Sequence, residues 1–143
     1  MTPNSNQLSF STLTQSYDAI LIPNGTSINT ITLISTGSTN ASVITDILFR
    51  SQDSSARNFN IIICPTGSQA NPENNRIQVS VPAQSGNNGS TLIASLATLA
   101  PTLFDIDLAG NRVIALESGM SIYVQNTAAL TGNFIITSKR RDF

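Results

Sequence analysis

Few side chains in this sequence have the type and spacing that catalysis requires. It contains no histidine, so an imidazole cannot act as a general base, activate a serine or cysteine nucleophile, or bind a metal. A serine–lysine pair is formally possible, but the single lysine, Lys139, lies in a charged segment where water keeps its amine protonated. The sequence therefore predicts no catalytic site, and we expect a protein that is not an enzyme.

Asp105 and Asp107 form a carboxylate pair. They lie two residues apart in an alternating stretch, so both side chains point to one face of a strand. Such a pair could bind calcium or transfer protons. The simpler interpretation, which we favour, is a water-facing side of a strand whose other side is apolar. We accordingly predict no metal site and no cofactor.

The only cysteine, Cys64, follows three isoleucines and has no cation near it in the sequence. This setting predicts a buried, structural thiol and excludes an intrachain disulfide. Arg57 and Arg76 lie in polar loops, where solvated or ion-paired guanidinium groups are the usual outcome.

A run of three cations, Lys139, Arg140 and Arg141, stands close to an aromatic residue, Phe143. One interpretation is a solvated end of the chain. The alternative is a tail that binds an acidic groove on a neighbouring subunit, steered by its charge and anchored by the aromatic ring. These four residues are the candidate partner-binding residues.

The elements that would position these residues are strands. In the stretch from Phe104 to Val124, three alternating runs are separated by turn residues, which predicts an antiparallel meander. Similar short runs recur along the chain, and about eight strands at this spacing predict an all-β fold, an antiparallel β-sandwich or jelly roll. The exception is Ser90 to Ala100, where helical spacing of apolar residues predicts one short helix, capped by Ser90 and ended by Pro101.

Period-2 alternation also predicts the core. The residues expected to face inward are Val43, Ile47, Phe49, Phe59, Ile61, Ile77, Val79, Val81, Phe104, Ile106, Leu108, Val113, Ile122, Val124 and Phe134. The run Phe59 to Cys64 is apolar at nearly every position. It is either central in a sheet covered on both sides, or one of its faces meets a neighbouring molecule.

The chain divides into an N-terminal arm, residues 1–16, and one β-sandwich domain, residues 17–143. The arm has few apolar residues, and ordering a residue costs about 1–2 kcal/mol of backbone entropy. We therefore expect the arm and the segment 139–143 to be mobile in the free protein and ordered by a partner.

Composition limits the partners. Charged residues make up 10% of the chain, the net charge is −1, and Ser, Thr and Asn supply 50 of its 143 residues. Such a charge provides no basic field for nucleic acid, and the apolar runs are too short to cross a membrane. The start of the sequence lacks the features of a signal peptide, so we expect synthesis in a reducing cytoplasm. A neutral surface suits packing against other chains, although turns and strands alone would also explain the composition.

The stretch DLAGNRVIALESGMSIYVQNTAALTGNFIIT, followed by Arg141-Asp142-Phe143, resembles small β-sandwich proteins of the head structures of tailed bacteriophages. The resemblance lies in an apolar-x-x-Gly-x-x-apolar strand pair, here Leu116 to Ile122, in the segment Gln125 to Thr137, and in the final Asp-Phe. A looser match extends upstream over Ile20 to Leu33.

This resemblance implies a structural protein of the virion, made in the host cytoplasm, and it carries over no catalytic residue. We expect a capsid decoration (cement) protein that binds the major capsid protein as a homotrimer and stabilises the shell. The alternative is a tail, neck or host-recognition module that binds glycans through its Ser-, Asn- and Thr-rich loops.

Overall fold

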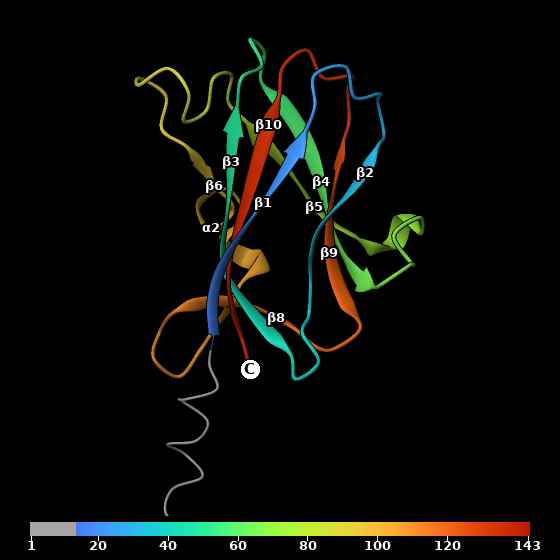
Figure 1. The fold of residues 1–143 in the computed structure, drawn as a ribbon, viewed down its shortest axis with the longest axis vertical. Helices are drawn as coiled ribbons and strands as arrows, with labels where there is room; N and C mark the ends of the chain where they lie inside the picture. The colour runs from blue at the N-terminus through green and yellow to red at the C-terminus, as the bar shows by residue number, and fades with distance from the viewer. Residues whose placement is uncertain (1–13) are drawn as a thin grey trace, which may run out of the picture.

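The computed structural model describes residues 14–143, which form two antiparallel β-sheets packed face to face (Figure 1). The six-stranded sheet has the order β1 (Thr14–Ile22), β10 (Phe134–Asp142), β3 (Ser42–Ser51), β8 (Arg112–Leu116) and β7 (Asp105–Ile106), with β6 (Ala94–Ser95) beside β3. The four-stranded sheet has the order β2 (Ile31–Thr36), β9 (Met120–Asn126), β4 (Arg57–Pro65) and β5 (Asn75–Val81). Short helices occur at Pro72–Asn74, Leu96–Leu99 (α2) and Pro101–Leu103. The all-β sandwich expected from the alternation is confirmed.

The core between the sheets is built around three fully buried phenylalanines. Phe49 and Phe134 come from the larger sheet and Phe59 from the smaller one. The ring centroid of Phe59 lies 5.9 Å from that of Phe49 and 5.1 Å from that of Phe134, the second pair meeting edge to face. The other predicted core residues that are buried are Ile47, Ile61, Val79, Val81, Phe104, Ile122 and Val124. Ile77 is half-buried against this core.

The alternation fails at four predicted core positions. Ile106 is 63% exposed and Leu108 is fully exposed, because residues 105–112 form a hairpin that neither sheet covers. Val43 and Val113 are half-buried and line a cleft on the outward face. In β3, Thr45 has no counterpart in β10 and forms a β-bulge. The bulge shifts the alternation by one residue, so Ile47 and Phe49 after it face inward as predicted, whereas before it Ile44 is buried in place of Val43.

The helix predicted over Ser90–Ala100 is wrong over most of its length. Strand β6 precedes α2, which is a single turn. The carboxylate of Asp46 in β3 accepts hydrogen bonds from the Ser95 hydroxyl, at 2.6 Å, and from the Ala97 amide, at 3.1 Å. A side chain far away in the sequence therefore fixes the start of the helix, and Ser90 does not cap it.

The predicted meander is also wrong in its second half. β7 and β8 pair as a hairpin, but β8 and β9 belong to different sheets. The turn between them passes from one sheet to the other and packs against the β2–β3 loop, which crosses in the opposite direction. Gly37 of that loop donates its amide to the Met120 carbonyl at 2.9 Å, and a Cβ at Gly37 would collide with the backbone of Glu117.

The outward face of β4 is covered by the same chain. Ile62, Cys64 and Tyr123 form a second buried apolar cluster on this face. The β4–β5 loop reaches this cluster, because its Gly67 amide donates to the Tyr123 hydroxyl at 3.2 Å. Both faces of the run Phe59 to Cys64 are thus covered within one molecule, and Cys64 is buried as predicted.

The segment expected to be a mobile basic tail is part of the sheet. Residues 139–142 complete β10, which pairs with β1 on one side and β3 on the other. The expectation of a mobile C-terminal tail is therefore wrong for these residues. The N-terminal arm predicted for residues 1–16 lies outside the described residues, except for Thr14–Ser16, which begin β1.

Candidate functional site

A cleft of about 660 Å³ opens on the outward face of the six-stranded sheet, beside the β7–β8 hairpin. Val43 and Thr45 form part of its wall from β3, and Arg141 and Phe143 come from the end of β10 and the residue after it. Two of the four predicted partner-binding residues, Arg141 and Phe143, are therefore brought together.

Strand geometry explains why Arg141 reaches this cleft. In β10 the residues at even positions from 134 to 138 are buried in the core, so Arg141 stands on the opposite, outward face. The Phe143 amide donates to the Ala41 carbonyl at 3.1 Å, which holds the chain against β3 beyond the last strand pair. The position of Phe143 is thus set by backbone contacts.

The β7–β8 hairpin and the end of β10, which both contribute residues to this cleft, carry exposed apolar and cationic side chains. We call them the cleft end of the molecule, and they are Ile106, Leu108, Arg112, Arg141 and Phe143. Leu108 is fully exposed and Phe143 is 49% exposed. Among residues 14–143, Arg112 and Arg141 form no ion pair. This end therefore offers apolar contact area together with two guanidinium groups that can bind carboxylates, of which that of Arg112 also donates to the Ala97 carbonyl at 3.4 Å.

Arg140 is used inside the sandwich instead. Its guanidinium donates to the Ser35 hydroxyl and the Thr36 carbonyl of β2, both at 2.9 Å. It also forms ion pairs with Asp18, at 3.3 Å, and Asp142, at 3.2 Å. Arg140 thus links the two sheets, whereas Lys139 lies on the outward face, opposite Tyr17 and Asp46 in the register.

Asp107 stabilises the hairpin turn. Its Oδ1 accepts hydrogen bonds from the amides of Ala109, at 3.0 Å, and Asn111, at 2.8 Å. Asp105 and Asp107 are both exposed. In the part of the chain that the structure describes, no three Asp, Glu, Cys or His residues gather where they could hold a metal ion. None of its helices is long and apolar enough to span a membrane.

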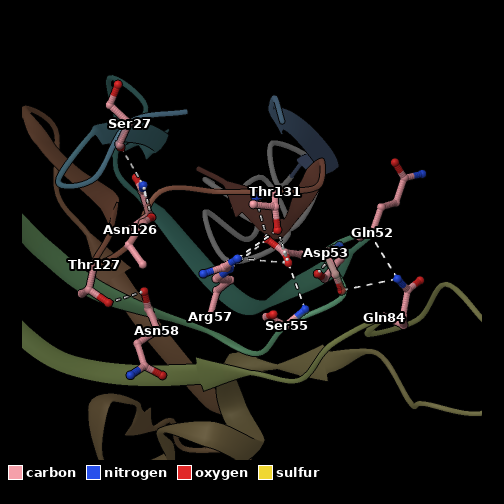
Figure 2. Close-up of polar contacts among 12 residues, drawn as sticks. Ser27, Gln52, Asp53, Ser55, Arg57, Asn58, Gln84, Asn126, Thr127 and Thr131 are labelled. Carbon is pink, nitrogen blue, oxygen red and sulfur yellow. Dashed lines mark hydrogen bonds and ion pairs between the residues drawn. The ribbon is translucent and has the colours of Figure 1, made fainter. Parts of the chain in front are cut away.

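A second polar centre, which the sequence did not reveal, surrounds Asp53 at the opposite end of β3 (Figure 2). Asp53 is fully buried, and its Oδ2 lies 2.8 Å from Arg57 Nε. The carboxylate also accepts hydrogen bonds from the Ser55 amide and from both the amide and the hydroxyl of Thr131, each at 2.9 Å. This cluster, the Asp53 clasp, joins the β3–β4 connection to the β9–β10 loop.

The clasp keeps Asp53 ionised. Burial raises the pKa of its carboxyl, but the hydrogen bonds from Arg57, Ser55 and Thr131 outweigh burial and lower the pKa from 3.8 to about 2. Gly132 lies so close that a Cβ there would collide with the Asp53 backbone. A carboxylate with every oxygen engaged and no access to solvent suits stability and not chemistry on a substrate.

Only part of these two sites could be predicted from the sequence. The sequence predicted that Arg57 is either solvated or ion-paired. The structure shows the ion pair, with Asp53, although Arg57 begins β4 and does not lie in a loop. Asp53 was missed because its partner Thr131 is 78 residues away. The only local signal was the four-residue spacing between Asp53 and Arg57.

No protein-family model matches this sequence, and a search of curated proteins finds no match either. Among solved structures, the chain is similar to a protein of the cyanophage Pam1 capsid asymmetric unit, with 8% sequence identity and a TM-score of 0.47. That alignment covers 92% of this chain and 85% of the other. A protein of the virus-like particle of giant freshwater prawn Macrobrachium rosenbergii extra small virus aligns with 10% identity and a TM-score of 0.38, over 92% of this chain and 80% of that one. Both TM-scores are below 0.5. We therefore assign the fold class from the strand order and pairing of this chain and not from these similarities.

Proposed function

We propose that this chain is a structural protein of a bacteriophage virion, a capsid decoration (cement) protein that binds the major capsid protein through the cleft end. The observation that carries the proposal is the cleft end itself. Leu108 and Phe143 expose apolar area there, and the guanidinium groups of the same end have no ion-pair partner among residues 14–143. An apolar site with carboxylates at its edge, on a neighbouring virion protein, would match this arrangement.

The sequence resemblance to head-structure proteins supports the same role. It covers the β7–β8 turn, β8, β9 and most of β10, and the turn, β8 and the end of β10 contribute residues to the cleft, whose remaining wall comes from β3. The segment that resembles those proteins therefore contributes much of the proposed contact surface. The protein would reside in the virion after synthesis in the host cytoplasm.

The expected homotrimer stays a prediction. Its sequence argument was that both faces of Phe59 to Cys64 are apolar, but a loop of the same chain covers the second face. A three-fold assembly would need another surface, or would form only on the shell.

Binding to purified particles tests the contact surface. We expect Leu108→Asp and Arg141→Glu each to reduce particle binding by about tenfold or more, because they place a carboxylate in an apolar contact or opposite an acidic one. Leu92→Asp and Arg50→Glu are matched controls, since Leu92 is 89% exposed in the loop at the other end of β3 and Arg50 is exposed on the outward face of the larger sheet. The proposal is wrong if the control variants weaken binding as much as the cleft variants.

Copy number tests the place of the protein in the virion. Quantitative mass spectrometry of purified particles should give a copy number comparable with that of the major capsid protein. A number typical of a tail or neck component would instead favour the host-recognition alternative.

A further inference from the structure

Strand β1 is an unprotected sheet edge. It is nine residues long and pairs with β10 over its whole length without a register shift, while its other side pairs with no strand in the described chain. An open edge of this kind presents a row of backbone amide and carbonyl groups that can pair with another strand. Natural proteins usually block such edges with short strands, bulges, prolines, charged side chains on the edge or charged residues that point inward.

The other edges of the two sheets carry such protection. β7 and β6 have only two residues each. β5 is interrupted by a bulge at Arg76, and the register of β2 shifts between Leu33 and Ser35. β1 contains no proline, lysine or arginine. Its one charged residue, Asp18, lies on the same face of the strand as the buried Ile22, and its charge is balanced by the ion pair with Arg140 at 3.3 Å.

We propose that β1 is the contact by which two copies of this chain associate, pairing antiparallel about a two-fold axis at Ala19. A two-fold contact requires a strand that is complementary to itself. The outward residues Tyr17, Ala19 and Leu21 provide this, because two large side chains flank a small one. Tyr17 is 61% and Leu21 is 58% exposed.

The register centred on Ala19 also suits the charges. It places Tyr17 opposite Leu21 of the second copy, an aromatic–aliphatic pair of the kind that stabilises antiparallel strands. It places Asp18 opposite Ile20 of the second copy, so the two Asp18 carboxylates do not face each other directly. A register centred on Asp18 would oppose them.

The space beneath β1 is open to a second copy. A groove of about 380 Å³ runs between β1 and β2, and its lining includes Ile20 and Leu33. Inward side chains of an added strand would enter this groove and cover Leu33, which is 45% exposed. The pairing would join two six-stranded sheets into one continuous sheet.

Sedimentation of the free protein tests this inference without particles, so its outcome is separate from that of the proposed function. We expect the wild-type mass to rise with concentration to that of a dimer, or of a larger assembly with an even number of copies. Ala19→Lys places two ammonium groups against each other at the axis and should weaken association about tenfold or more. Ser80→Lys, at an exposed position of β5, is the matched control and should leave it unchanged. A wild-type protein that stays monomeric or trimeric at every concentration overturns the inference.

A cysteine cross-link provides a second test that does not depend on the charge variant. Directly opposed residues in antiparallel strands have Cα atoms about 4.5–5.5 Å apart, within disulfide range. Under mild oxidation Ala19→Cys should form a covalent dimer, while Ser80→Cys should not, and native Cys64 is buried and does not compete. Equal cross-linking of both variants overturns the inference. The inference is also overturned if the free protein is always monomeric and Ala19→Lys nevertheless abolishes particle binding. In that case the edge of β1 would pair with a strand of another virion protein.

Discussion

At the residue scale, Asp53 links electrostatics to stability. Its folded pKa of about 2 lies below the ordinary 3.8, so the folded state binds the proton less tightly than the unfolded state. The stabilisation is therefore complete above pH 4 and is lost as the pH falls toward 2. At about 1.4 kcal/mol per pKa unit, this shift corresponds to about 2 kcal/mol.

Replacing Asp53 tests this linkage. Asp53→Asn leaves the Arg57 guanidinium without its carboxylate, and we expect the free energy of unfolding at pH 7 to fall by about 3 kcal/mol. The variant should also lose stability less steeply than the wild type between pH 4 and pH 2. Urea denaturation at several pH values measures both effects. Asp105→Asn, at an exposed carboxylate, is the control and should keep the wild-type slope; an unchanged slope in Asp53→Asn would show that other carboxylates dominate acid unfolding.

At the element scale, the sequence predicted where the strands lie better than it predicted which strands pair with one another. Alternation identified the buried faces of β5 and β9 and the phenylalanine core, because these strands have one periodic apolar side. It misassigned Val43 because the bulge at Thr45 depends on the register with β10, which local sequence does not contain. The helix start at Asp46 and the change of sheet between β8 and β9 likewise depend on residues distant in sequence.

The end of β10 is a second case at the element scale, because its sequence predicted a mobile tail and the structure shows a paired strand. Removing residues 139–143 would unpair the first residues of both β1 and β3 and delete the link that Arg140 makes between the sheets. We expect this deletion to destabilise the free protein strongly or to prevent folding, as seen in its melting temperature and circular-dichroism spectrum. Phe143→Ala, which keeps all of β10, should change the free energy of unfolding by no more than about 0.5 kcal/mol. If the deletion variant keeps the wild-type melting temperature, residues 139–143 do not contribute to the stability of the sheet and form a separate tail.

At the scale of the whole molecule, the chain passes repeatedly between the sheets. β1 and β3 belong to the larger sheet, β2 and β4 to the smaller one, and β9 and β10 again to different sheets. The crossings meet in pairs, at Gly37 near one end and at Gly132 and the Asp53 clasp near the other. Neither sheet can therefore be completed while the other is unfolded.

This arrangement predicts a single cooperative unfolding transition, and the chain carries its own probes for it. The sequence has no tryptophan and two tyrosines, Tyr17 in the larger sheet and Tyr123 in the smaller one. In Tyr123→Phe the fluorescence reports on the larger sheet, and in Tyr17→Phe on the smaller one. Within each variant, the fluorescence midpoint in urea should coincide with the circular-dichroism midpoint, although Tyr123→Phe shifts both because it loses the hydrogen bond from Gly67. Separate midpoints within one variant would mean that the sheets unfold independently, and that the crossings at the two ends do not couple them.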